Sequence, residues 1–241
     1  MTNLKFDKEI TALLVIDPYN DFISDGGKLW GRLKTVAEEN NCVPHMLQVL
    51  SAARKAELRM FYALHHRYRP GDYETWKYVA PIQKAAWLRK TFENGTWGGE
   101  IRREFEPQSG EIVDQKHWGS SGFANTDLDL QLKKYGIHQL IVMGLIAHTC
   151  LESTVRYAAE NGYEVTVVKD AVADYSDEEM HAALDVNIPK LRQCSCDHKR
   201  SHRINFFSLN LGNRFAARMP SLACFGSCVE VTESCNVTSS C

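Results

Sequence analysis

Apolar residues fall into short continuous runs separated by segments with helical spacing. A continuous apolar run is typical of a strand buried on both faces of a parallel sheet. Such runs, and weaker strand candidates, occupy residues 10–16, 59–64, 111–114, 139–143 and 164–168. Helical spacing or helix ends occur between and after them, at residues 42–58, 128–134, 151–161 and 177–186. This alternation predicts an α/β fold with three α-β-α layers around a mainly parallel, doubly wound sheet.

One segment breaks the alternation. Residues 65–110 carry several aromatic side chains, many charges, and Pro and Gly at their start. The pattern indicates a loop or lid with short helices beside the sheet.

Composition narrows the class of protein. The chain has 241 residues, of which 44% are hydrophobic, and a net charge of −2. Without a basic excess, we expect no nucleic-acid partner. No apolar run reaches the roughly 18 residues of a membrane span, and charges occupy residues 1–9, where a signal peptide is apolar. We therefore expect a cytoplasmic protein without membrane contact.

The last part of the chain differs from the rest. Residues 190–241 hold six of the eight cysteines, and seven Lys or Arg against three Asp or Glu. We interpret residues 1–189 as one domain and residues 190–241 as a divergent, Cys-rich, basic and poorly ordered tail. Zinc and disulfide interpretations are less favoured, because the cysteine spacing is irregular and no signal peptide is visible. Residues 203–208 are the candidate for a last strand.

Three reactive side chains follow predicted strands. Asp17 comes after the first strand, Lys116 after the third and Cys150 after the fourth, directly before a helix. Ligands bind at the carboxyl ends of strands in such sheets, so we expect the three to meet. A helix N-terminus and an ammonium group both lower a thiol pKa, and a carboxylate can accept the proton. The alternatives remain a small buried cysteine, a turn aspartate and a solvated lysine.

Four segments resemble the isochorismatase-like cysteine hydrolase family, which includes nicotinamidases, N-carbamoylsarcosine amidases and ureidoacrylate amidohydrolases. They contain LLVIDPYNDF, VDQKHWGSSGFANTDL, GLIAHTCLEST and GYEVTVVKDA, at residues 13–22, 113–128, 144–154 and 162–171. The resemblance covers roughly residues 8–189, and it implies a parallel sheet flanked by helices, in agreement with the periodicity.

The resemblance also implies roles for individual residues. Asp17 would be the general base, Lys116 its electrostatic partner and Cys150 the nucleophile. A cis peptide between Ile146 and Ala147 would aim the N–H groups of Ala147 and Cys150 at the substrate oxygen. The implied reaction is cleavage of a C–N bond in a small amide or ureido compound through a thioester. The alternatives are a vinyl-ether hydrolase of the isochorismatase type and a catalytically silent binding protein.

The pocket, cofactor and assembly expectations follow from the same resemblance. Pocket candidates lie in or beside the matching segments: Asn20, Phe22, His66, Trp118 and Phe123. The nicotinamidase branch carries a metal-binding Asp where this chain has Leu64, and adjacent histidines in an extended chain point apart. We therefore expect no metal and no cofactor. In this family, contacts between subunits often complete the pocket, so the resemblance implies a homo-oligomer, either a dimer or a tetramer.

Overall fold

The centre of the molecule is a six-stranded sheet. The computed structural model describes residues 6–191 and 194–196. All neighbouring strands are parallel, in the order β3-β2-β1-β4-β5-β6. In chain order the strands are Thr11–Ile16, Arg59–Ala63, Ile112–Val113, Gln139–Leu145, Glu164–Ala173 and Cys194–Cys196. Every residue of β1 is buried, as its continuous apolar run predicts.

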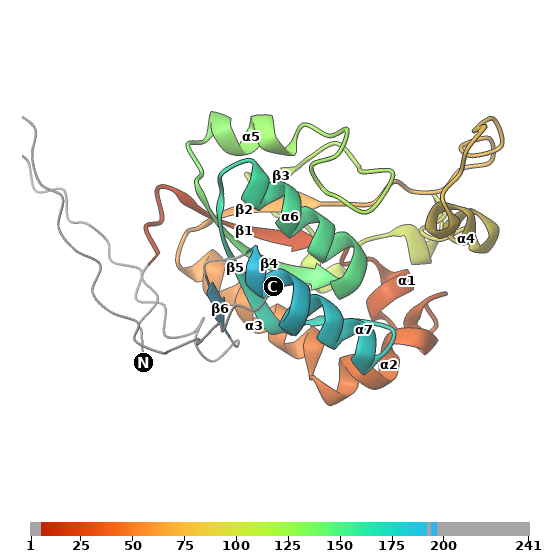
Figure 1. The fold of residues 1–241 in the computed structure, drawn as a ribbon, viewed down its shortest axis with the longest axis horizontal. Helices are drawn as coiled ribbons and strands as arrows, with labels where there is room; N and C mark the ends of the chain where they lie inside the picture. Colours follow the sequence, from red (N-terminus) through yellow and green to blue (C-terminus); the bar gives the residue numbers. More distant parts are fainter. Residues whose placement is uncertain (1–5, 192–193, 197–241) are drawn as a thin grey trace, which may run out of the picture. The chain divides into compact units, whose positions relative to one another are not determined.

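Helices cover both faces of the sheet, which confirms the predicted three layers (Figure 1). Helices α2 (Trp30–Glu39) and α3 (Cys42–Lys55) pack on one face, where they meet Leu13 and Val15 of β1. Helices α5 (Leu128–Lys134) and α6 (Glu152–Glu160) pack on the other, against the alternate residues of the same strand. The alternation of side chains along β1 thus divides one apolar run between two cores.

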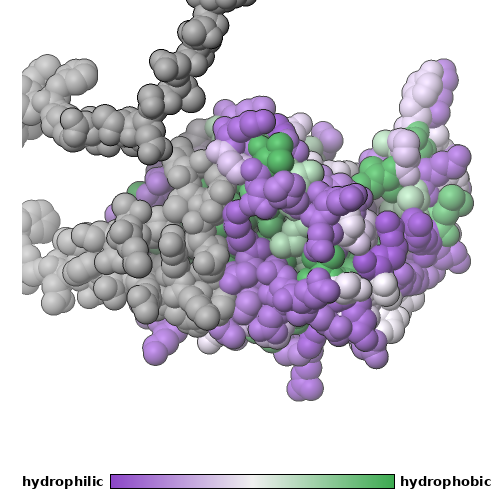
Figure 2. All heavy atoms as spheres, turned by 60° about the horizontal axis from the view of Figure 1, so that its bottom comes forward, coloured by the Kyte–Doolittle hydropathy of each residue, from purple (hydrophilic) through white to green (hydrophobic). Residues whose placement is uncertain are grey.

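The 65–110 segment forms the expected excursion. It contains α4 (Pro81–Arg89) and two 3₁₀ turns, Trp97–Gly99 and Arg103–Phe105. Unlike α2 and α3, α4 has no buried residue. It lies to one side of the sheet in Figure 1, and hydrophobic side chains gather at the same side of the surface in Figure 2. They include Ile82 and Leu88, which are 48% and 71% exposed.

The chain order creates a switch point at the middle of the sheet. The chain builds β1, β2 and β3 toward one edge and then adds β4, β5 and β6 on the other side of β1. The connections after β1 and β4 therefore leave in opposite directions and open a crevice at the carboxyl ends of these strands. The short helices α1 (Asn20–Ile23) and α7 (Asp177–His181) follow β1 and β5 near this edge.

The end of the sheet differs from the expectation. The strand that pairs with β5 is Cys194–Cys196, so the 190–241 segment contributes at least these three residues to the sheet. The expected strand at residues 203–208 and the tail cysteines beyond Cys196 lie outside the described residues. Over the part of the chain that the structure describes, no helix is both long and apolar enough to cross a membrane.

Candidate active site

Asp17 ends β1 and is fully buried. Its φ of 51° turns the chain sharply out of the strand, a conformation that Asp adopts more readily than most residues. The backbone N–H of His65 donates a hydrogen bond of 2.6 Å to Asp17 Oδ1, and Oδ2 has no partner among the described residues. The carboxylate is thus held on one oxygen and available on the other.

Cys150 follows β4 in a π-helical turn, Ala147–Leu151, that leads into α6. The thiol residue is only 7% exposed. Gly144 of β4 allows the close approach of β4 to β1. Its φ is +123°, and a Cβ at this position would overlap the backbone of Ile16. A side chain at residue 144 would push β4 away from β1, and Cys150 away from Asp17.

His117 comes from the segment after β3 and is fully buried. The segment continues the sheet pairing: His117 N–H donates to Leu64 O, and His66 N–H donates to His117 O. The imidazole Nδ1 lies 2.8 Å from the carbonyl oxygen of Gly119, which can only accept, so Nδ1 carries a hydrogen. The other nitrogen, Nε2, lies 3.4 Å from Asp17 Oδ1.

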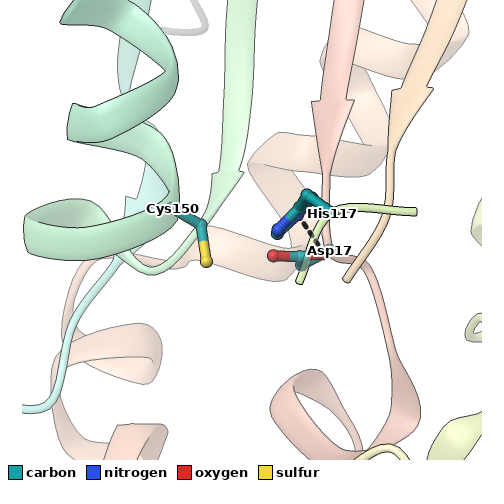
Figure 3. A group of neighbouring side chains, drawn as sticks. All are labelled: Asp17, His117 and Cys150. Atoms are coloured by element: carbon teal, nitrogen blue, oxygen red, sulfur yellow. Dashed lines mark ion pairs between the residues drawn. The ribbon is translucent and has the colours of Figure 1, made fainter. Parts of the chain in front are cut away.

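The structure brings Asp17, His117 and Cys150 together at the switch point. One donor atom of each lies within 4.8 Å of the others. In Figure 3, the three side chains converge from β1, from the segment after β3 and from the turn before α6. The expected meeting of Asp17 with Cys150 is therefore present in the geometry, and the third side chain is a histidine.

Lys116 does not occupy the place that the sequence interpretation gave it. His117 faces Asp17, with Nε2 3.4 Å from Oδ1. Adjacent residues of an extended segment point to opposite sides, so Lys116 is not expected on the same side. Lys116 is half-buried, and its pKa is lowered by burial and by the charges of Arg67 and Arg69. Among the described residues, no carboxylate forms an ion pair with it. His117 is therefore the basic residue beside Asp17 in this structure, and the role of Lys116 stays a prediction.

The electrostatics of Cys150 also differ from the expectation. Burial raises the pKa of the thiol well above its usual value, and the Asp17 carboxylate raises it further. The Thr149 hydroxyl, 3.8 Å from Sγ, and the Ile146 backbone act in the opposite direction without outweighing them. The expected low pKa is therefore wrong: the resting side chain is a neutral thiol, and a base must take its proton during attack.

The two nearby histidines titrate in opposite directions. Burial alone lowers the pKa of His117, but the Asp17 carboxylate and the hydrogen bond to Gly119 O outweigh it, and the pKa is raised. Burial and the charge of His117 lower the pKa of His65 to about 4. These shifts favour the charged form of His117 beside Asp17 and the neutral form of His65.

The cis peptide lies one bond earlier than expected, between Leu145 and Ile146. The prediction of a cis bond at Ile146–Ala147 is therefore wrong by one residue. Ile146 and Cys150 both line the pocket described next, whereas Ala147 is fully buried and does not. The backbone N–H groups of Ala147 and Cys150 remain the candidate oxyanion donors.

A pocket of about 120 Å³ opens above the thiol. Its walls come from α1, α2, α4, the segment before α6 and the end of β5, and Phe22 is the one expected pocket residue among them. Residues that sequence reasoning missed also line it: Arg32, His65, Arg89, Phe92 and Tyr175. These arise from separate elements without a common motif, so only the spacing of the folded chain reveals them.

The other expected pocket residues, Asn20, His66, Trp118 and Phe123, do not line this pocket in the structure. The Asn20 side-chain amide bonds to Trp97 O and accepts from Ser24, which ties α1 to a loop. His66 pairs with Asp72 at 2.8 Å and stacks on Trp118 at 3.7 Å between ring centroids, outside the pocket lining. Phe123 is buried in the core beneath α5 and α6, 5.8 Å from the Tyr163 ring.

Within the described part of the chain, two clusters have ligand atoms close enough to hold a cation. The first is the trio of Asp17, His117 and Cys150, whose thiolate and imidazole are ligand types of zinc. The second is His148, Asp174 and Glu179. The Asp174 carboxylate there already accepts hydrogen bonds from the backbone N–H groups of His148 and Tyr175, which is the role of a loop anchor.

The fold and site define a class of protein: a three-layer α/β protein with a thiol pocket at the switch point of its sheet. The model of the Isochorismatase domain matches residues 11–191. The chain therefore belongs to the isochorismatase family, and it is a hydrolase.

Several relatives have more specific names. Ureidoacrylate amidohydrolase RutB of Pantoea ananatis is 29% identical over 76% of this chain and 77% of its own length. The structure is similar to a cysteine hydrolase from Pseudomonas syringae pv. phaseolicola, with a TM-score of 0.69, 22% identity and coverage of 83% and 94%. It is also similar to N-carbamoylsarcosine amidase from Thermoplasma acidophilum, with a TM-score of 0.58, 25% identity and coverage of 81% and 99%.

Proposed function

We propose that this hydrolase cleaves the C–N bond of a small amide or ureido compound through a thioester on Cys150. The observation that carries the proposal is the convergence of a buried thiol, a carboxylate and an imidazole, with the thiol lining a pocket. The names of the relatives, an amidohydrolase and an amidase, support the same bond type.

The first half-reaction begins with a neutral thiol. Asp17 accepts the Sγ proton while Sγ attacks the carbonyl carbon, and the carbonyl oxygen becomes an oxyanion. Backbone N–H groups at Ala147 and Cys150 stabilise this oxyanion. When the tetrahedral intermediate collapses, the C–N bond breaks and the leaving nitrogen takes the proton from Asp17, which leaves an acyl thioester and free ammonia or amine.

The second half-reaction uses water. Asp17 accepts a proton from the attacking water, the C–S bond breaks, and Sγ takes the proton back as the acid or carbamate leaves. His117 stays protonated throughout and supplies the positive charge that the resemblance had given to Lys116. Its Nε2 lies 3.4 Å from Asp17 Oδ1, which places this charge beside the carboxylate that takes and returns the proton.

The proposal is tested by ammonia release from nicotinamide, ureidoacrylate, N-carbamoylsarcosine and simple aliphatic amides. We expect turnover of at least one compound and its loss in Cys150→Ala, with Cys42→Ala as the control because Cys42 is the other described buried thiol. Acid-quenched protein should carry an acyl group on Cys150 by mass spectrometry.

The alternatives give different results in the same experiment. Cleavage of a vinyl ether that survives in Cys150→Ala would identify the ether hydrolase. Ligand binding without turnover of any compound would identify the silent binding protein. A metal held by the trio would make activity sensitive to dialysis against a chelator, whereas the thioester route predicts unchanged activity.

We further propose that the protein is a homo-oligomer. The support is α4, which has no buried residue and exposes Leu88 and Ile82, while nearby Tyr78 is 82% exposed. Apolar side chains that gather on one exposed surface are typical of a surface that a partner protein covers.

A further inference from the structure

The walls of the thiol pocket carry charge of one sign. Arg32 of α2 and Arg89, the last residue of α4, both line the pocket that contains Cys150. No Asp or Glu belongs to this lining within the described ranges, and the neutral His65 adds no charge. Among the described residues the pocket lining therefore holds two guanidinium groups and no carboxylate, although Asp174 directly precedes Tyr175 and accepts its backbone N–H.

Tyr175 lies with the two arginines and the thiol in the lining of the same pocket. The guanidinium carbon of Arg32 lies 3.7 Å from the centre of the Tyr175 ring, and Tyr175 also lines the pocket. Burial raises the pKa of Tyr175 to about 12; Arg32 and Arg89 act to lower it, and Cys150 and Asp174 act to raise it. Two residues from α2 and α4 thus reach one point near the reacting sulfur.

The two arginines also differ from other arginines of the described chain. Arg54, Arg102 and Arg156 each pair with a glutamate at 2.7–2.9 Å. Arg32 and Arg89 form no such pair with a described carboxylate, and the hydrogen bond from Arg89 to Ala85 O is 3.4 Å long. Their N–H groups are therefore available to a ligand, and a carboxylate matches the planar guanidinium donors.

We propose that Arg32 and Arg89 bind the carboxylate of an anionic substrate, so that the substrate is a small amide or ureido compound carrying a carboxylate group. This inference rests on the proposed function. Arg32 is fixed by its stacking on Tyr175, and Arg89 is carried by the exposed helix α4, so the second contact forms when α4 closes over the substrate. The carbonyl at the other end of the molecule then lies at Cys150.

The experiment compares pairs of compounds that differ in one group. N-carbamoyl-β-alanine is paired with 3-ureidopropan-1-ol, and succinamate with 4-hydroxybutyramide, so a hydroxymethyl group replaces each carboxylate. For the unaltered protein we expect kcat/KM at least about 100-fold higher for the anion, since a charge-assisted hydrogen bond to each arginine contributes about tenfold or more. In Arg32→Gln/Arg89→Gln the preference should fall below about tenfold.

Two variants separate charge from packing. Arg32→Lys keeps the charge and should keep part of the preference. Arg59→Gln is the matched control, because Arg59 also stacks on a tyrosine, 4.5 Å from the Tyr135 ring centre, but does not line this pocket. It should keep the full preference. An equal loss in Arg59→Gln, or a preference that survives in the double glutamine variant, would overturn the proposal.

A binding measurement separates this inference from the proposed function. Cys150→Ala is titrated with each compound by calorimetry, and the anion should bind more tightly only while both arginines are present. Anion binding through the arginines without turnover in the unaltered protein would refute the amidohydrolase and retain the anion site. Turnover of both members of a pair at equal rates, or equal binding of both, would refute the anion site.

Discussion

The floor and the outer wall of the thiol pocket differ in burial: the residues of the floor are buried, and those of the outer wall are at least partly exposed. By floor we mean Cys150, which lines the pocket, together with Asp17 and His117, which lie beside its thiol; all three are buried at the carboxyl ends of the strands. The outer wall is α4, whose side chains are all at least partly exposed and which no core holds. The difference indicates that the reacting groups and Arg32 are positioned before substrate arrives, whereas Arg89 is carried by an exposed helix. Rigid groups suit proton transfer and attack, and a movable wall suits entry and release.

The largest effect should come from the floor. Asp17→Asn keeps the oxygen that accepts the His65 N–H but removes the base, so we expect kcat to fall about 10³-fold while the protein remains folded. Asp25→Asn is the control, because Asp25 is exposed and lies outside this pocket. The rate of ammonia release is the measurement, and a loss below tenfold would assign the base to another group.

Gly144→Ala tests how tightly the floor is constrained. The added Cβ overlaps the Ile16 backbone at a positive φ, so we expect the free energy of unfolding to fall by about 3–4 kcal/mol. Gly162→Ala is matched, because its φ is also positive but nothing lies within 4 Å of the new Cβ. It should lose only about 1 kcal/mol. Equal losses in urea unfolding would mean that β1 and β4 can separate without cost.

Asp114 lies beneath the floor with both carboxylate oxygens unpartnered among the described residues. Burial raises its pKa to about 8, so the unfolded chain releases this proton above about pH 4 and the folded protein only near pH 8. Folding is therefore penalised increasingly between these values. We expect Asp114→Asn to raise the free energy of unfolding by about 2–3 kcal/mol at pH 8 and not at pH 3.

Asp127 is the control for Asp114, because its pKa is shifted in the opposite direction. Burial raises the pKa of Asp127, but hydrogen bonds from Gln131 and from the Gln115 backbone outweigh it and lower the pKa. Its ionised form stabilises the fold, and this contribution is present above the unfolded pKa and lost as the pH falls. Asp127→Asn should therefore destabilise at neutral pH. A stability of Asp114→Asn that is lower than that of the unaltered protein at pH 8 would contradict the argument.

His117 should set the alkaline limit of activity. Its charge is lost as the pH rises through its raised pKa, and kcat should then fall about tenfold. Asp17, Asp114, His65 and Cys150 surround it; His65 is neutral, and ionisation of Asp114 near pH 8 favours the charged imidazole. His117→Lys should move the limit to higher pH. Lys116→Gln should leave it unchanged, and movement in that variant instead would restore the role first assigned to Lys116.

The same contrast explains how much the sequence predicts. The buried strands carry continuous apolar runs, so their order, the parallel sheet and the positions of Asp17 and Cys150 follow from periodicity and motif. The choice between Lys116 and His117 depends on strand register, which is fixed by the pairing of His117 with Leu64 and His66. Arg32, Arg89 and Tyr175 meet only through the packing of α2, α4 and the end of β5, and no local pattern encodes that.

The smallest effect should come from the wall. Leu88 is 71% exposed on α4, so Leu88→Ala should change the free energy of unfolding by less than about 0.5 kcal/mol. Leu132 of α5 is fully buried, and the same substitution there should cost about 2–4 kcal/mol. If a second copy covers α4, Leu88→Ala weakens association in sedimentation velocity while the unfolding of each chain is unaffected. If Leu88→Ala leaves association unchanged, α4 is not part of a subunit interface and serves only as a wall of the substrate pocket.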